Sequence, residues 1–478
     1  MAGQSLKDKT AKGLFWGGLS NVSMQLLNLF FGIFLARLLT PADYGMVGML
    51  TIFSLIAGSL QESGFIAALI NRKEIRHDDY NAVFWFSISA SLCIYTILYF
   101  CAPLIARFFN QPELTALARY SFLGFVISST GVAQSAYLHK KLMVKQRAIT
   151  SISALIVSGT VGVTLAYNGF SYWGIATQNI VYISVAMCFY WYFSPWRPTF
   201  TFDFRPIREM FSFSCKMLAT NIFNHINNNI FSVILGKFYS SKDVGFYNQA
   251  NKWNGMGHSL ISGMINSVAH PILAQVSDDK ERQLRIFRKM MRFTAFVSFP
   301  AMFGLSLIAP ELIAIAITDK WAASAQILRL LCISGAFIPI CGLCSNLVVS
   351  KGKSNIHMWC NISLGLLQLL VICFIYPYGI HTMIVTYVCI NIAWLFVWYY
   401  FVHREIGYRF HHLLMDIVPF LLIALFSMLA CYYLTRPITN IYLLFVGKIA
   451  IAASLYLVLM WLSGAQTFKE SIGYFRKR

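Results

Sequence analysis

The sequence predicts an all-α, polytopic membrane protein of about 14 transmembrane helices, and three observations support this fold class. Hydrophobic residues make up 58% of the 478 positions and charged residues only 12%, about half of the roughly 25% that soluble domains carry. The apolar residues gather in runs of about 20, the length with which a helix crosses a ~30 Å hydrocarbon core. The connections between the runs alternate in Lys and Arg content. A soluble fold is therefore not expected.

The apolar runs give the positions of the helices, and the basic residues give their orientation. With the N-terminus in the cytoplasm, 27 of the 38 Lys and Arg residues fall in cytoplasmic segments and 7 in opposite ones. Cytoplasmic loops carry an excess of basic residues, so both termini are expected in the cytoplasm. One missed helix would invert half of the pattern. In chain order, we expect spans at 14–36, 44–69, 80–102, 120–138, 148–167, 172–193, 212–236, 244–269, 293–309, 322–349, 357–376, 382–402, 413–434 and 441–462.

The spans group into two halves and an appendage. We expect an N-lobe of helices one to six at 1–193, an interfacial cytoplasmic linker at 194–211, and a C-lobe of helices seven to twelve at 212–402. Helices thirteen and fourteen and a basic tail follow at 403–478. No connection exceeds about 20 residues, which leaves no room for a soluble catalytic domain. The first residues run into the first span without a small-residue cleavage site, so no removed signal peptide is expected.

An internal repeat relates the two halves. LARLLTPADYG at 35–45 aligns without gaps to LGKFYSSKDVG at 235–245, so that Asp43 matches Asp243 and Gly45 matches Gly245. Each repeat would hold six helices, and an even number returns the chain to the same side of the membrane. The halves are therefore expected to be parallel repeats, which typically bind substrate at their interface near the midplane of the bilayer.

Polar side chains mark one face of the seventh predicted span. They follow the spacing i, i+3, i+4 and i+7 of a helical face, at Asn221, Asn224, His225 and Asn228. Asn21 and Asn28 form a weaker stripe in the first span. Polar groups within a span are costly and normally face a bundle interior or water. The stripes therefore indicate either a wet central cavity or hydrogen bonds that hold helices together.

Three charged residues within the spans are further candidates. Lys252 lies well inside the eighth span and Lys216 one turn into the seventh, where its ammonium could also reach the membrane surface. Glu62 is the only carboxylate clearly inside a span of the first half. It could form an ion pair or take up a coupling proton.

Motifs for covalent chemistry and for nucleotide binding are absent from the sequence. KGKS at 351–354 resembles the end of a P-loop, but that motif needs a glycine where Leu347 stands. The chain is thus expected to have no catalytic residues, no metal site and no cofactor, and not to be an enzyme. The net charge of +20 is explained by cytoplasmic loops near anionic lipids, so no nucleic acid partner is expected.

Several segments resemble a known transporter family. ARLLTPADYGMVGM and ESGFIAALINRKEIRHDDYNAVFWF in the first half, with DVGFYNQANKW and APELIAIAITDKWAASAQILRLL in the second, are similar to the polysaccharide exporters of the lipopolysaccharide, colanic acid and teichuronic acid type. These exporters belong to the multidrug/oligosaccharidyl-lipid/polysaccharide superfamily. The resemblance covers roughly residues 10–465. It implies twelve core helices in two lobes, two further helices, and alternating access without ATP.

The resemblance also implies a substrate and a location. The substrate would be an undecaprenyl-diphosphate-linked oligosaccharide, flipped from the cytoplasmic to the periplasmic leaflet of a bacterial inner membrane for cell-surface polysaccharide biosynthesis. Its partners would be this lipid-linked oligosaccharide, membrane lipids, and a polysaccharide polymerase with export machinery, and the protein would be a monomer. A diphosphate needs cations and glycan hydroxyls suit amides, so Lys216, Lys252 and the amide stripe of the seventh span are expected to contact these groups.

Two other functions stay open. A multidrug cation antiporter of the same superfamily would favour acidic residues in the cavity, whereas the residues singled out here are mainly basic and neutral. An integral-membrane polysaccharide polymerase would normally carry a long extracytoplasmic loop or clustered acidic residues at one face, and the sequence has neither.

Overall fold

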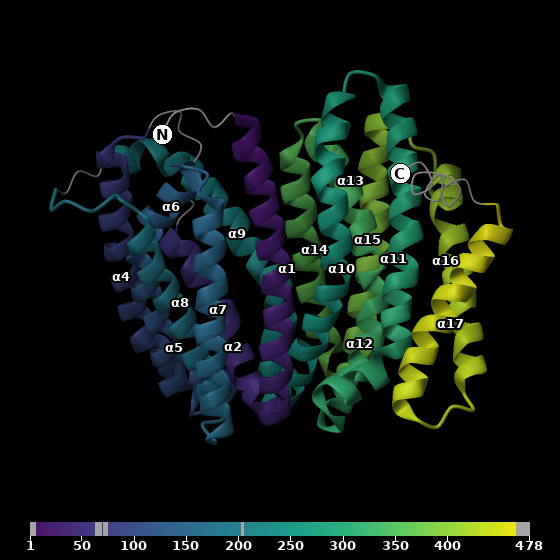
Figure 1. Cartoon of the computed structure of the whole chain (residues 1–478), viewed down its shortest axis with the longest axis horizontal. Helices are drawn as coiled ribbons and strands as arrows, with labels where there is room; N and C mark the ends of the chain where they lie inside the picture. The colour runs from purple at the N-terminus through teal and green to yellow at the C-terminus, as the bar shows by residue number, and fades with distance from the viewer. Residues whose placement is uncertain (1–5, 63–68, 70–74, 202–204, 465–478) are drawn as a thin grey trace. The chain divides into compact units, whose positions relative to one another are not determined.

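The computed structural model describes residues 6–62, 69, 75–201 and 205–464, and within these ranges it consists of helices and connections without a strand (Figure 1). The chain divides into two compact units, residues 1–245 and 246–478. The first unit contains α1 (Leu6–Leu38), α2 (Pro41–Glu62), α4 (His77–Phe109), α5 (Leu114–Ser129), α6 (Val132–Lys140), α7 (Val144–Tyr167), α8 (Tyr172–Phe193) and α9 (Arg205–Phe238).

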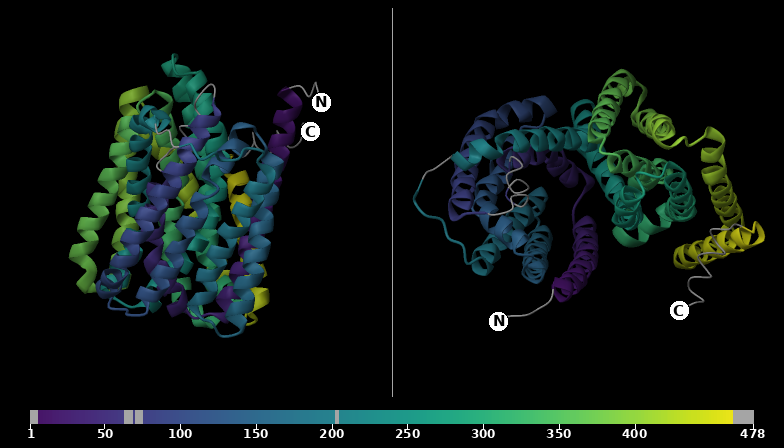
Figure 2. Two further views of the ribbon diagram at one scale, coloured as in Figure 1. Left: turned by 90° about the vertical axis from the view of Figure 1, so that its left-hand side faces the viewer. Right: turned by 90° about the horizontal axis from the view of Figure 1, so that it is seen from above.

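The second unit begins in the first turns of α10 (Ser241–Gln275). Seen from above, the helices of each unit run roughly along the line of sight (Figure 2). The remaining elements are α11 (Lys280–Ile317), η1 (Asp319–Trp321), α12 (Ala322–Gly335), α13 (Ile338–Ser350), α14 (Ser354–Ile375), η2 (Tyr376–Tyr378), α15 (Ile380–Ile406), α16 (Phe410–Thr435) and α17 (Ile441–Leu462).

The all-α, polytopic membrane fold is confirmed, and the number of spans is consistent with 14. Within the described residues, ten helices are long and apolar enough to cross a membrane, or eleven if the bent pair α5–α6 counts as one span. The helices α8, α9 and α10 are less apolar but contain 22, 34 and 35 residues. At 1.5 Å per residue each is long enough to cross a ~30 Å core. The lower hydropathy of α9 and α10 comes largely from their amides.

Two of the expected spans are each broken into a pair of helices. The span at 120–138 corresponds to the end of α5 followed by α6, which are bent by 48° relative to each other. The span at 322–349 corresponds to α12 and α13, and Pro339 lies in the first turn of α13. Proline is well suited to the first turn of a helix because the backbone N–H it lacks would have no intrahelical partner there.

In the first unit, α1 and α9 pack against different helices. The helix α7 lies between α1 and α8, and α9 packs against α2 and α4. Phe31 of α1 is buried and lies against Gly159 of α7, where a side chain would overlap its ring. The connection after α8 follows α4: Asn81 donates to the carbonyl of Thr201 at 2.6 Å and accepts from the backbone N–H of Thr199 at 2.9 Å. The domain boundaries expected from sequence stay a prediction.

In the second unit, α11 is the central helix, and the appended helices α16 and α17 are attached to it through buried ions. The helix α11 packs against α12, α13, α16 and α17. The carboxylate of Asp416 in α16 is 1% exposed and accepts from Arg288 at 2.9 and 3.1 Å and from Arg292 at 2.8 Å. In α17, the Lys448 ammonium donates to Glu311 at 2.6 Å. The buried carboxylate of Asp416 and the buried pair Lys448–Glu311 therefore each have a partner of opposite charge. A buried ion needs such a partner, because the interior has a low dielectric constant.

The two repeated segments fold in the same way. Asp43 accepts from the backbone N–H and the hydroxyl of Thr40, and the Thr40 hydroxyl accepts from the Asp43 backbone. Ser240 and Asp243 make the same three hydrogen bonds at the start of α10. These are reciprocal capping interactions, which satisfy backbone donors at a helix start. The equivalent chemistry at an offset of 200 residues supports the internal duplication.

Candidate functional site

The polar stripe of the seventh expected span lies on α9. The side chains of Asn221, Asn224 and His225 are partly exposed within the described chain, and Asn228 is exposed. In the next two turns of the helix, Phe231 and Leu235 are buried at 1% and 0% exposure. The stripe is therefore a polar face that the surrounding described helices cover only in part. Because hydrocarbon is a costly environment for amides, such a face favours contact with water or a polar ligand.

The weaker stripe of the first span lies on α1. Asn21 and Asn28 are both exposed, and their neighbours Leu26 and Phe30 are also exposed, at 61% and 54%. The structure packs α1 against α7, whereas α9 packs against α2 and α4. The two amide stripes thus belong to helices with different neighbours. Their assignment to a substrate cavity stays a prediction.

Of the three charged candidates, only Lys252 has a side chain among the described residues. Lys252 in α10 is exposed, and within the described residues it makes no hydrogen bond or ion pair. Lys216 and Glu62 lie in α9 and α2, but their side chains are outside the described residues. Next to Lys252, the Trp253 indole N–H and the Asn254 amide oxygen are buried and have no hydrogen-bond partner among the described residues. Unpaired buried polar atoms are uncommon, so this part of α10 has polar capacity that its own unit does not use.

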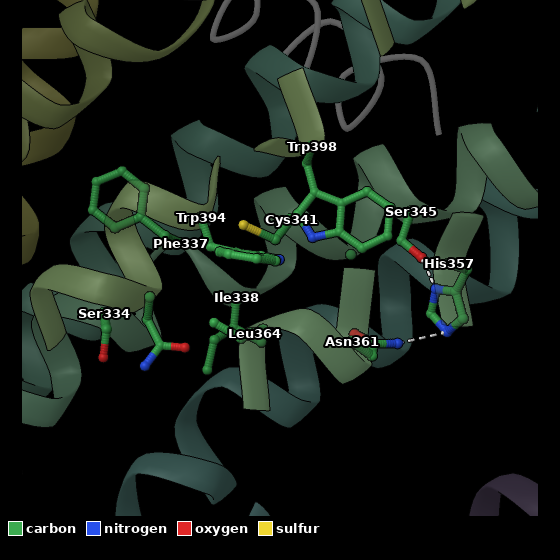
Figure 3. Close-up of a pocket in the computed structure, with 12 residues that line it drawn as sticks. Ser334, Phe337, Ile338, Cys341, Ser345, His357, Asn361, Leu364, Trp394 and Trp398 are labelled. Atoms are coloured by element: carbon green, nitrogen blue, oxygen red, sulfur yellow. Dashed lines mark hydrogen bonds between the residues drawn. The ribbon is translucent and has the colours of Figure 1, made fainter. Parts of the chain in front are cut away.

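A polar and aromatic pocket of about 260 Å³ that was not predicted from the sequence lies entirely within the second unit (Figure 3). It is formed by α12, α13, α14 and α15. Its twelve lining residues are Ser334, Phe337, Ile338, Cys341, Gly342, Ser345, His357, Asn361, Leu364, Asn391, Trp394 and Trp398. None of these is an acid, a lysine or an arginine. The spacing of four residues between His357 and Asn361 and between Trp394 and Trp398 puts each pair on one helical face, which was the available signal.

A hydrogen-bonded chain orders the polar wall of the pocket. His357 Nδ1 lies 2.6 Å from the Ser345 hydroxyl, and His357 Nε2 lies 3.0 Å from the Asn361 side-chain nitrogen (Figure 3). The Trp398 ring lies beside the imidazole, with centroids 6.0 Å apart. The side chain of Trp398 is 4% exposed, so it is held in place by packing. These two hydrogen bonds fix the orientation of three neutral polar groups.

The opposite wall offers an unused donor. The indole N–H of Trp394 is buried and has no hydrogen-bond partner within the described residues. Asn391, one turn earlier, donates to the carbonyl of Tyr387 at 2.8 Å and accepts from Gln368 at 3.2 Å. An indole N–H that is buried usually finds a partner. Because the Trp394 N–H has no partner among the described residues, it marks a position where a ligand oxygen could accept a hydrogen bond.

Metal binding has no support in the part of the chain that the structure describes. No three His, Cys, Asp or Glu side chains gather there in a way that could hold a metal ion. The groups that do gather are neutral amides, hydroxyls, indoles and one imidazole, all of which exchange hydrogen bonds with other neutral groups.

Comparison with known proteins gives consistent matches in sequence and in fold. Residues 34–326 match the model of a family described as polysaccharide biosynthesis protein. The lipopolysaccharide biosynthesis protein WzxC of Escherichia coli (strain K12) is 24% identical over 364 residues, 75% of this chain and 73% of that protein. The succinoglycan biosynthesis transport protein ExoT of Rhizobium meliloti (strain 1021) is 23% identical over 326 residues, 68% of this chain and 66% of that protein.

A solved structure shares the fold over nearly the whole chain. The lipid II flippase MurJ in its inward closed conformation superposes with a TM-score of 0.77 at 15% identity, covering 97% of this chain and 99% of that one. The similarity extends over both units, including the appended helices α16 and α17. At this identity the match establishes the fold.

Proposed function

The chain belongs to the family of polysaccharide biosynthesis proteins, since the family model matches residues 34–326, and we propose that it flips a lipid-linked oligosaccharide across the membrane. The substrate is an undecaprenyl-diphosphate-linked oligosaccharide that moves from the cytoplasmic to the periplasmic leaflet of a bacterial inner membrane. The family match carries this proposal. The relatives support it because their names assign them to polysaccharide biosynthesis, and one of them to transport.

The proposed mechanism is alternating access without ATP. Two compact units with cores of their own suit a transporter in which rigid halves rock around a shared substrate site. Short connections leave no nucleotide-binding domain within the chain, so the energy would come from an ion gradient or from consumption of the flipped product. Glu62 remains our candidate for ion coupling.

The proposed contacts divide between charge and hydrogen bonding. Lys216 and Lys252 would hold the diphosphate, and the amides of α9 would hold glycan hydroxyls, together with Asn21 and Asn28. The exposure and lack of an ion pair at Lys252 within the described residues support this assignment, because an ammonium within a span needs a counter-charge. A polysaccharide polymerase and export machinery would act on the flipped product.

The proposal is tested by the lipid-linked sugar that accumulates in a deletion strain. Complementation with the wild-type protein should clear the cytoplasmic intermediate, whereas Lys252→Ala should clear it at least tenfold more slowly at equal expression. Loss of one charge-assisted contact is worth about 1.5–3 kcal/mol, or roughly 10- to 150-fold. Lys280→Ala is the matched control, since Lys280 is exposed at the start of α11. If no intermediate accumulates and sensitivity to cationic drugs changes instead, the protein is an antiporter.

A further inference from the structure

From the geometry of the pocket in the second unit we infer that it binds one neutral pyranose ring of the transported glycan. This inference rests on the proposed function and adds a sugar subsite built from α12, α13, α14 and α15. The pocket has a volume of about 260 Å³, slightly below the range of sites for drug-sized ligands. That size suits a single sugar ring with its hydroxyls better than a whole oligosaccharide.

The lack of charged residues in the lining of the pocket favours a neutral ligand. None of the twelve lining residues is an acid, a lysine or an arginine, so a phosphate would find no counter-charge and a cationic drug no carboxylate. Burying an ion without a partner is strongly unfavourable. The polar groups that are present are two hydroxyls, two amides, an imidazole and two indole N–H groups. They match the donors and acceptors of sugar hydroxyls.

The hydrogen-bonded chain presents the Ser345 hydroxyl to such a ligand. If Asn361 donates to Nε2 of His357, then Nδ1 carries the proton and donates to Ser345, whose own hydroxyl hydrogen can donate to a sugar oxygen. If the imidazole has the opposite tautomer, Ser345 donates to Nδ1 and its oxygen can accept from a sugar hydroxyl. In either arrangement the Ser345 hydroxyl pairs with a group that both donates and accepts, as sugar hydroxyls do.

The aromatic wall supplies the second element of sugar recognition. Trp394 and Trp398 are one helical turn apart on α15 and both line the pocket (Figure 3). Their faces can cover the apolar C–H face of a pyranose, while the unpartnered Trp394 N–H can donate to one of its oxygens. A buried donor without a partner is costly, so a bound sugar oxygen would stabilise the site itself.

The position of the pocket fits the loading step. His357 lies in the first turn of α14, directly after the connection at residues 351–353. Trp398 lies two turns before the end of α15 at Ile406. The charge pattern assigns both of these helix ends to the cytoplasmic side. The pocket would therefore meet the glycan on the side where the lipid-linked oligosaccharide is made.

Binding to the purified full-length protein tests the inference. The probes are the lipid-linked oligosaccharide extracted from the deletion strain and undecaprenyl diphosphate without sugar. Trp394→Phe keeps the ring and removes the N–H, and Asn361→Leu removes one end of the polar chain. Each should weaken binding of the sugar-bearing lipid about fivefold, the typical value of one hydrogen bond, and leave binding of the sugar-free lipid unchanged. Trp359→Phe is the matched control, because Trp359 is on α14 and 61% exposed.

The outcomes separate the subsite from the proposed function. Equal binding of the sugar-bearing lipid by wild type and both variants would overturn the subsite, as would an equal loss for both lipids. If Trp394→Phe does not fold, as judged by thermal unfolding, Asn361→Leu decides. Flipping in proteoliposomes is measured in parallel. A wild-type protein that binds the sugar-bearing lipid but does not flip it would contradict the proposed function, while the selective loss in the variants would still support the pocket.

Discussion

At the scale of single residues, the ion cluster around Asp416 is the point at which the largest energetic effects are expected. Asp416 is 1% exposed and accepts from two arginines. Tyr408, in the connection between α15 and α16, donates to the same carboxylate at 3.1 Å. Burial and this neighbouring carboxylate raise the pKa of the Tyr408 hydroxyl, so Tyr408 remains a donor throughout the physiological pH range.

We predict that Asp416→Ala destabilises the protein by about 3–5 kcal/mol, because it leaves two guanidinium groups facing each other without a counter-charge. Arg288→Ala should cost more than Arg292→Ala, since Arg288 makes two hydrogen bonds to the carboxylate and Arg292 one. Thermal unfolding in detergent measures the effect. Lys353→Ala is the control: its ion pair with Glu405 leaves the lysine 43% exposed and should contribute at most ~1 kcal/mol. An equal loss at both sites would contradict the prediction.

A second prediction concerns the buried pair Lys448–Glu311, which joins α17 to α11. The two side chains are 8% and 9% exposed and 2.6 Å apart. Lys448→Met and Glu311→Leu should each destabilise by about 3–5 kcal/mol, because each leaves the other charge uncompensated. The double variant should be more stable than either single variant, since it buries no ion. A double-mutant cycle of thermal unfolding checks this, and additive losses would show that the pair is not coupled.

Residues were predicted well where local pattern determines the outcome and poorly where tertiary contact does. The match of Asp43 with Asp243 followed from the ungapped alignment of the two segments. The capping that both residues make depends only on residues three positions apart, so it is preserved in both segments. The partner of Lys448 lies 137 positions away, and the neighbours of His357 come from three helices. Nothing in a single sequence specifies such contacts. The polar wall of the pocket was missed because only His357 and Asn361 share a helix, and their partner Ser345 lies on another apolar span.

At the scale of elements, the helix starts of α2 and α10 approach each other through their paired glycines. A Cβ at Gly45 would overlap the carbonyl oxygen of Ser241, and a Cβ at Gly245 would overlap that of Pro41. Since the overlap is with backbone rather than with a flexible side chain, neither position has an inexpensive relaxation. The repeat therefore conveys a packing requirement: each helix start needs a residue without a side chain.

We predict that Gly45→Ala and Gly245→Ala each destabilise the protein by about 1–3 kcal/mol, the usual cost of overpacking. Gly58→Ala is a matched control in the same helix, because nothing lies within 4 Å of its added Cβ. It should be neutral or stabilise by up to ~1 kcal/mol through helix propensity. Circular dichroism during heating distinguishes the variants. Equal melting temperatures for Gly45→Ala and Gly58→Ala would rule out the close approach.

Hydropathy predicted most of the helices, but it did not predict the breaks within two of the spans. Long apolar runs gave α4, α7, α14, α15 and their neighbours, since a span must be continuous and apolar whatever its partners. The breaks between α5 and α6 and between α12 and α13 were missed, because each broken pair taken together is apolar enough to be predicted as one span. In contrast, α9 and α10 were predicted as spans although they are less apolar, because leaving out either one would have inverted the alternation of basic residues along the rest of the chain.

At the scale of the whole molecule, the orientation in the membrane decides the direction of every proposed step. The same fold could be inserted in the membrane in either orientation. The assignment of the cytoplasmic side therefore depends on where the basic residues lie. With the N-terminus in the cytoplasm, the connections after α10 and α15 are cytoplasmic and the connection after α16 is periplasmic. The pocket between α12 and α15 is then loaded from the cytoplasm, as flipping of a cytoplasmic substrate requires.

We predict that a membrane-impermeant maleimide labels Thr439→Cys in intact spheroplasts and labels Glu281→Cys only after lysis. Both side chains are exposed, and the two positions lie in the α16–α17 connection and at the start of α11. The unsubstituted protein measures labelling of the native cysteines. The reverse pattern would mean that the orientation is inverted and that the proposed sugar pocket lies on the periplasmic side. Flipping of a cytoplasmic substrate would then have no loading site on the cytoplasmic side. Labelling of both positions from outside would mean that the number of helices between them is even rather than odd.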